Sequence, residues 1–258
     1  MNFPFRCPAC DAATTVPYAD TGMHDVRCAS CRARYALYLR QHKFETLFDF
    51  GARALLDGYG REATLNFASS LERALEFYLR ATTLERAAGT DAPLEDAQAA
   101  LDATWRTVAS QSERQLGAFA FAYLTREGRA PDFLTPGALG TDFRNRVVHR
   151  GYIPTRAEVD AYAEKVYAIT TRLLRDLGDA VTHAQLEQER AFEAHLLALP
   201  DDVQPVFLEH SGILRAARHA THGAPVAAPA NDPGAFARVL QERAPLIERL
   251  FTKMPKRH

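Results

Sequence analysis

Cysteine is absent after residue 31, and long apolar runs are absent from all 258 residues. Because a disulfide-stapled fold spreads its cysteines along the chain, this confinement excludes a disulfide scaffold for most of the protein. The apolar stretch 116–124 is far shorter than the roughly 18 residues of a membrane helix, and we expect it to be a buried helix segment. The N-terminus lacks a basic flank followed by an apolar core, so we predict no signal peptide and a cytoplasmic location.

Neither sign of charge is in excess, since 31 basic and 32 acidic side chains give a formal net charge of −1. This balance excludes a polycation that coats nucleic acid through its total charge, but it allows a local basic patch. Hydrophobic residues make up 47% of the chain and charged residues 24%, which is typical of a globular protein and argues against extensive disorder.

Three segments with different sequence patterns divide the chain. Residues 1–43 hold the cysteines and a period-two stretch at 33–40, which predicts a half-buried strand. Residues 44–180 carry apolar stripes of helical period, as in a helical bundle. Residues 181–258 are predicted to be a helical extension with an Ala/Pro-rich linker at about 222–233. The predicted fold class is therefore mainly α, with a small β unit before the bundle and a helical extension after it.

Local signals place the ends of several helices. Thr141 or Asp142 is expected to cap a short helix that reaches about His149. Thr155 with Glu158 has the spacing of a capping box for the next helix. The remaining helices are predicted at 44–58, 61–86, 93–128 (one or two helices), 183–199 and from about 232 onward, with a kink or break at Pro245.

The four cysteines form two C-x2-C pairs, Cys7 with Cys10 and Cys28 with Cys31. The 17 residues between the pairs (11–27) fit the spacing of a four-cysteine zinc site. Two cysteines on one tight turn can direct both sulfurs at one ion, and two such turns complete a tetrahedron. The segment therefore looks like a zinc ribbon with one structural Zn²⁺, and four thiolates leave no open position for zinc catalysis.

Two disulfides, or a redox C-x-x-C motif, are the alternatives for these cysteines. A redox motif needs only one pair and usually a βαβ context, which the sequence lacks. The ribbon also carries a basic edge, made of Arg32, Arg34, Arg40 and Lys43. This edge is predicted either to hold a phosphate backbone or to be a solvated strand face.

Arginine followed five positions later by histidine occurs twice, at Arg144–His149 and at Arg190–His195. The first arginine is followed by the amide Asn145, and its histidine lies at a predicted helix end beside two loops. The second pair lies inside an amphipathic helix, so we interpret His195 as structural.

The segment Arg144-Asn145-x-x-x-His149, at a helix end in an all-α region of this size, resembles the motif of the HEPN ribonucleases. The resemblance covers roughly residues 44–180 and leaves out the ribbon and the C-terminal third. It implies a metal-independent RNA endonuclease that acts as a homodimer, with the two motif helices facing one cleft. It also implies a toxin or anti-phage role, in which an antitoxin or another regulatory partner would silence the enzyme.

The chemistry of these residues agrees with that implication. RNA supplies its own nucleophile, the 2′-OH, and cleavage needs proton transfer and stabilisation of charge on the phosphate. Histidine, with an ordinary pKa of about 6.5, transfers protons near neutral pH, and arginine binds phosphate oxygens. Asn145 and His149 share a helix face, but Arg144 and His149 are separated by about 140° around the axis. This angular gap favours a cleft formed by two protomers. The expected cleavage products carry a 2′,3′-cyclic phosphate and a 5′-hydroxyl.

Five neighbours are weaker candidates. Arg146 and Arg150 would extend the phosphate contact or simply satisfy carbonyls at the helix end. Tyr152 would stack on a base or pack against the protein. Glu72 and Glu76 lie on a helix that can approach the motif, and Glu76 also fits an i,i+4 ion pair with the arginine at position 80.

Other functions stay open. One alternative is a non-catalytic module that binds a nucleotide or a partner protein. Another is a zinc-ribbon regulator that binds nucleic acid, although the sequence shows no clear recognition helix or strongly basic face near the ribbon. In the toxins paired with a nucleotidyltransferase, a modified tyrosine lies two residues after the histidine, whereas here that position is Gly151 and the tyrosine is Tyr152. Residues 183–258 are compatible with covering the cleft or with extending the dimer.

Overall fold

The structure is a computed structural model that describes residues 2–91, 93–209, 212–215 and 232–250. Most of the predicted linker at 222–233 and the basic end of the chain at 253–257 lie outside these residues. The elements follow in the order β1 (Asn2–Arg6), β2 (Ala13–Pro17), β3 (Met23–Arg27), β4 (Arg34–Leu39), α1 (Lys43–Leu56), α2 (Gly60–Ala88), α3 (Leu94–Val108), α4 (Ser112–Glu127), α5 (Pro136–Leu139), α6 (Thr141–His149), α7 (Arg156–Leu177), a 3₁₀ turn (Gly178–Ala180), α8 (Val181–Leu196), β5 (Val203–Leu208) and α10 (Ala235–Leu250). The fold is mainly helical with a small N-terminal β region, as predicted.

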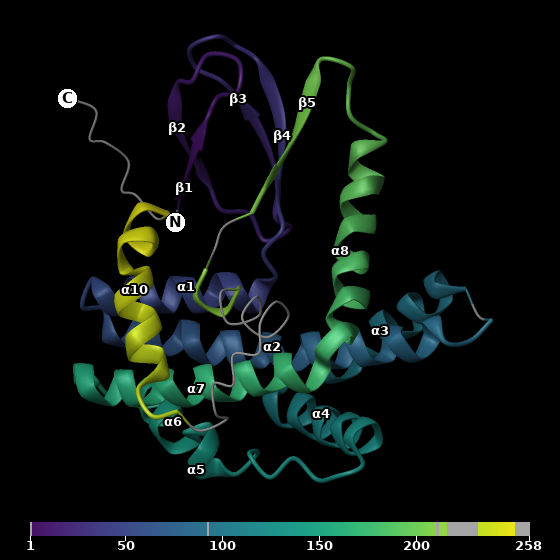
Figure 1. Ribbon diagram of the computed structural model, residues 1–258. Coiled ribbons are helices and arrows are strands. Elements are labelled where there is room, and N and C mark those ends of the chain that lie inside the picture. The colour runs from purple at the N-terminus through teal and green to yellow at the C-terminus, as the bar shows by residue number, and fades with distance from the viewer. Residues whose placement is uncertain (1, 92, 210–211, 216–231, 251–258) are drawn as a thin grey trace.

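The β region consists of two antiparallel hairpins. Strands β1 and β2 form one sheet, and β3 and β4 form the other together with β5. Side chains of both hairpins, among them Phe3, Phe5 and Leu37, bury a common small core. The hairpin turns between the paired strands each carry one C-x2-C pair, so the strands fix both pairs at the same end of the ribbon (Figure 1).

Strand β5 was not predicted, and it changes the environment of β4. It pairs with β4 in parallel, with Arg34 opposite Val203. The predicted half-buried strand is therefore buried at every position from Tyr35 to Leu39. One face packs into the hairpin core, while on the other Tyr38 lies against Phe192 of α8. Figure 1 shows α8 extending from the bundle to the sheet edge that β5 occupies.

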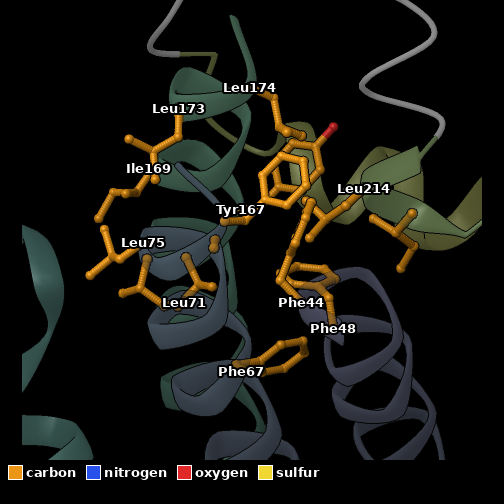
Figure 2. Close-up of a cluster of buried hydrophobic side chains, with 14 of the residues drawn as sticks. Phe44, Phe48, Phe67, Leu71, Leu75, Tyr167, Ile169, Leu173, Leu174 and Leu214 are labelled. Atoms are coloured by element: carbon orange, nitrogen blue, oxygen red, sulfur yellow. The ribbon is translucent and has the colours of Figure 1, made fainter. Parts of the chain in front are cut away.

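Helix α2 is the centre of the bundle and contacts α1, α7, α4, α8, α3 and α6. A wide apolar surface makes this possible, because the predicted stripe and the residues beside it are all buried, including Phe67, Leu71 and Tyr78. The predicted stripe of α7 is buried in the same core. Figure 2 labels core residues of α1, α2, α7 and the segment 212–215: Phe44, Phe48, Phe67, Leu71, Leu75, Tyr167, Ile169, Leu173, Leu174 and Leu214.

Three local predictions differ from the structure. The segment 116–124 is only half buried, with Phe121 74% exposed, because α4 packs on the bundle with one face. Gly140, and not Thr141 or Asp142, caps α6, since its left-handed backbone (φ 63°) ends α5 and begins α6 at the same residue. Helix α10 is not broken at Pro245 but continues through it, and a kink there stays a prediction. The capping box of Thr155 and Glu158 is confirmed.

Candidate functional site

The four cysteine sulfurs form a compact cluster. The Sγ atoms of Cys7, Cys10, Cys28 and Cys31 all lie within 4.8 Å of one another, and no disulfide joins them. Short Sγ–Sγ contacts join the two pairs, at 3.5 Å from Cys7 to Cys31 and 3.7 Å from Cys10 to Cys28. The four cysteines are therefore close enough to hold one metal ion.

The same backbone turn shapes both cysteine pairs. The N–H of Asp11 donates to the carbonyl of Cys7 at 2.8 Å, and the N–H of Arg32 donates to the carbonyl of Cys28 at 3.0 Å. Asp11 and Arg32 adopt left-handed backbone conformations (φ 55° and 67°), which are uncommon outside glycine. Each turn thus directs its two thiols toward the other turn.

A tyrosine hydroxyl supports the cluster from the strand side. The Tyr35 hydroxyl lies 3.2 Å from the Cys7 sulfur in the ribbon core. Its hydrogen bond lowers the pKa of the Cys7 thiol to about 6, and the same contact raises the pKa of Tyr35 to about 12. Because a metal binds the thiolate form, this hydrogen bond favours the metal-binding form of Cys7, whereas burial and the neighbouring cysteine side chains raise the pKa of Cys10 and of Cys31.

The basic edge of the ribbon is largely paired with carboxylates. Arg34 pairs with Asp202 at 3.0 Å, and Lys43 pairs with Asp20 at 2.7 Å. Arg40 pairs with Glu189 of α8 in the same way, at 2.8 Å. Three of the four cations therefore have an acidic neighbour that offsets their charge. A role of this edge in binding RNA stays a prediction.

Helices α2, α4 and α6 meet at the Arg144 side chain. Its Nη2 donates to Glu72 Oε1 at 3.1 Å, and its Nη1 donates to Asn145 Oδ1 at 3.1 Å. The hydroxyl of Ser112, the first residue of α4, donates to the same Glu72 oxygen at 2.8 Å. The guanidinium is thus fixed by acceptors from two helices.

These polar groups line a cavity of about 150 Å³ between α2, α4, α6 and α7. Its walls are mainly apolar, Leu139 of α5 contributes to them, and its charged and amide side chains come from α2, α4 and α6. The lining residues are Ala68, Leu71, Glu72, Leu75, Ser112, Glu113, Gln115, Leu116, Leu139, Thr141, Arg144, Asn145 and Tyr162.

His149 does not line this cavity. It is the last residue of α6 and is exposed, one helical turn beyond Asn145 on the same face. The structure therefore brings Arg144, Asn145 and Glu72 together within one chain, and it leaves His149 on the adjacent surface.

The candidate residues on either side of His149 pack on one another. The Arg146 guanidinium lies 4.4 Å from the centre of the Tyr152 ring and 3.5 Å from a Glu158 oxygen. The Tyr152 hydroxyl donates to both oxygens of Glu158, at 2.9 and 3.0 Å. Tyr152 therefore packs within its own chain, with Arg146 against the ring, while Arg150 is exposed after the helix end.

The remaining candidates form structural contacts. His195 Nδ1 lies 2.8 Å from the Tyr38 hydroxyl, and Arg190 pairs with Glu95 at 2.9 Å. This agrees with the interpretation of His195 as structural. Glu76 forms an ion pair with Arg80 at 3.2 Å, as the i,i+4 spacing suggests.

Ser112, Tyr162 and the leucines of the cavity could not be predicted as site residues, because no motif or spacing in the sequence links α4 and α7 to α6. Among the described residues, no helix is both long and apolar enough to cross a membrane. Comparisons of the chain with protein-family models, with curated proteins and with solved structures found no match. The function is therefore inferred from the residues of this chain alone.

Proposed function

We propose that the protein is a metal-independent RNA endonuclease of HEPN type, acting as a toxin or an anti-phage effector. The observation that supports this most is the fixed guanidinium of Arg144 beside a cavity, with the exposed His149 one turn further along the same helix. Two residues of different chemistry, one for phosphate and one for protons, thus occupy one short helix.

In this mechanism the 2′-oxygen of one nucleotide attacks the adjacent phosphorus and the bond from phosphorus to the 5′-oxygen breaks. The imidazole of His149 takes the proton of the 2′-OH, and the leaving 5′-oxygen receives a proton from that imidazole or from the His149 of the second protomer. Arg144 stabilises the charge on the phosphate, because its guanidinium keeps further N–H groups after the two bonds to Glu72 and Asn145. Glu72 acts as a positioning residue for that guanidinium.

A homodimer completes the proposed site. Within one chain, Arg144 and His149 project about 140° apart around the α6 axis. A second protomer that faces α6 would place its own Arg144 and His149 opposite the first pair. One cleft would then contain both a proton-transfer group and a phosphate-binding group on each side.

Zinc is the metal that we propose for the four-cysteine cluster. Four thiolates in a closed tetrahedral set suit Zn²⁺ and leave no position for substrate. Its role would be to hold the two hairpins together, apart from the chemistry at α6.

The test is cleavage of end-labelled total RNA and tRNA in excess EDTA by the parent protein and by His149→Ala. His183→Ala, which replaces a histidine of α8 outside the cavity, is the matched control. Cleavage by the parent and by the control, with cyclic-phosphate ends, and its loss in His149→Ala would support the proposal. A zinc assay after the EDTA exposure checks that the structural metal is retained.

Equal cleavage by the parent and His149→Ala would contradict the role of His149. The exposed position of His149 outside the cavity also favours a second function, a module that binds RNA or a nucleotide without cleaving it. If the parent protein binds RNA but cleaves no substrate, that result would favour the binding module.

A further inference from the structure

We propose that the cavity beside Arg144 binds a single pyrimidine base of the RNA, with cytosine preferred over uracil. This inference rests on the proposed function, because it takes RNA as the ligand. It assigns to the cavity the base whose 2′-OH attacks the phosphate. It therefore predicts where the enzyme cuts.

The size and walls of the cavity fit one six-membered ring. Its volume is about 150 Å³, and a cavity of about this volume in another protein holds a benzene ring. The side chains of Leu71, Leu116 and Leu139 supply apolar surface, and the Tyr162 ring supplies an aromatic one. A two-ring purine would need a larger space, so the volume selects against adenine and guanine.

Two neighbouring side chains of the cavity, Glu72 and Asn145, offer a free acceptor and a free donor, and the side chains of Glu113, Thr141 and Tyr162 add further polar groups to its lining. Glu72 uses Oε1 for the bonds from Arg144 and Ser112, and among the described residues no donor reaches its Oε2. Asn145 uses Oδ1 for the bond from Arg144, which leaves the two N–H groups of Nδ2. Gln115 is held at both ends of its amide, because its Oε1 accepts from Arg73 and its Nε2 donates to the carbonyl of Ala109.

This pair of groups matches the edge of cytosine. The exocyclic amino group of cytosine donates to a carboxylate, and its neighbouring ring nitrogen and carbonyl accept hydrogen bonds from an amide. Uracil carries a carbonyl oxygen where cytosine has the amino group, and that oxygen would face the Glu72 carboxylate. The charge of the carboxylate therefore disfavours uracil at this position.

The distance along α6 agrees with the chemistry at His149. Thr141, Asn145 and His149 follow one another at intervals of one helical turn on the same face. Asn145 and His149 are thus separated by roughly 6 Å along the axis. This spacing is about the distance from a base to the ribose 2′-OH and the phosphate of its own nucleotide. A base beside Asn145 would place its 2′-OH near the imidazole of His149.

The first test measures base preference with short RNAs that differ only in the nucleotide before one cleavable bond. The parent is expected to cut after cytosine at least about tenfold faster than after uracil, and to cut more slowly still after purines. Glu72→Gln keeps the shape and the bonds from Arg144 and Ser112, but places an amide donor where Oε2 was. This variant is expected to prefer uracil, a reversal that a purely structural role of Glu72 would not produce.

The second test separates the pocket from the enzyme activity. Binding of cytidine 3′-monophosphate and uridine 3′-monophosphate is measured by calorimetry with the His149→Ala protein. We expect Leu116→Trp, which fills the cavity, to abolish binding, while Leu124→Trp on the exposed face of the same helix leaves it unchanged. Circular dichroism checks that both variants fold. Glu72→Gln tests the carboxylate itself, because it removes the charge without changing the size of the side chain.

The outcomes distinguish the two proposals. Cleavage with no base preference, or with a preference that Glu72→Gln leaves unchanged, would overturn the pocket and leave the ribonuclease standing. Selective binding of the cytidine nucleotide that Leu116→Trp removes, together with no RNA cleavage by the parent, would support the pocket and overturn the ribonuclease.

Discussion

The buried carboxylate of Asp49 on α1 accepts a hydrogen bond from the backbone N–H of Ile213 at 3.0 Å. Its other oxygen accepts from the Gln41 side chain at 3.1 Å. Asp49 thereby connects α1 to the segment that follows β5, 164 residues further along the chain. Burial raises the pKa of Asp49 to about 7, with the Glu45 carboxylate adding to the rise and the hydrogen bonds and Arg243 opposing it.

This raised pKa predicts a pH dependence of stability. Asp49 titrates at about 3.9 in the unfolded chain and at about 7 in the folded protein. Between these values the folded state binds a proton that the unfolded state has released, so the group's contribution to stability falls as the pH rises, and is constant above about pH 7. Asp49→Asn should therefore gain stability relative to the parent from pH 4 to 7, by at most about 1.4 kcal/mol per pH unit. Urea unfolding at pH 5 and pH 8 measures the difference in free energy of unfolding between the variant and the parent. An equal difference at both pH values would contradict the prediction.

Gly212 makes the closest approach to the same carboxylate. A Cβ atom there would lie 2.2 Å from Asp49 Oδ2. Because the carboxylate is fixed by Gln41 and Ile213, we expect Gly212→Ala to destabilise the fold by about 1–3 kcal/mol. Gly117→Ala on α4 is the control, since nothing lies within 4 Å of its added methyl group. Urea unfolding compares the variants, and similar midpoints for both would show that the carboxylate moves easily.

Gly140 is predicted to fix the position of α6. It has φ 63°, and a Cβ atom would lie 2.8 Å from the Tyr162 ring of the cavity. Gly140→Ala should therefore cost more than about 1 kcal/mol of stability and lower RNA cleavage, because it displaces the helix that carries Arg144. Gly137→Ala in the preceding turn meets nothing within 4 Å and should be neutral. Thermal unfolding and cleavage rates are measured on both variants. Equal values for Gly140→Ala and Gly137→Ala would contradict the prediction.

Removal of the metal should affect the ribbon before it affects the bundle. We expect about one zinc per chain by atomic spectroscopy, and a strong reduction in Cys7→Ser and Cys28→Ser, whose sulfurs are buried. Far-ultraviolet circular dichroism should retain most of its helical signal, because the bundle core contains none of the ribbon residues. A parallel loss of helix and metal would show that the ribbon and the bundle fold as one unit. Full zinc content in both serine variants would contradict the assignment of the ligands.

The sequence was most informative where the interacting residues are near one another. The cysteine cluster followed from two short spacings, and the core stripes of α2 and α7 followed from helical periodicity. The contact of Glu72 with Arg144 was only suggested, because the two residues are 72 positions apart and packing decides which face of α2 meets α6. Strand β5 was missed because Pro205 and its short alternating pattern resemble a loop, and its pairing depends on a distant strand.

The parallel pairing of β4 with β5 also determines an order of assembly. Arg34 of β4 pairs with Val203 of β5, which lies 169 positions later in the chain. During synthesis from the N-terminus, the edge of β4 therefore stays unpaired until most of the chain has been made. Tyr38, which is completely buried in the finished protein, is uncovered during that interval, because α8 and β5 supply Phe192 and Phe207. An uncovered apolar strand edge is a site for intermolecular pairing. A ribbon expressed alone, without residues 181–208, would therefore be prone to aggregate, and the N-terminal unit cannot be transplanted as an independent module.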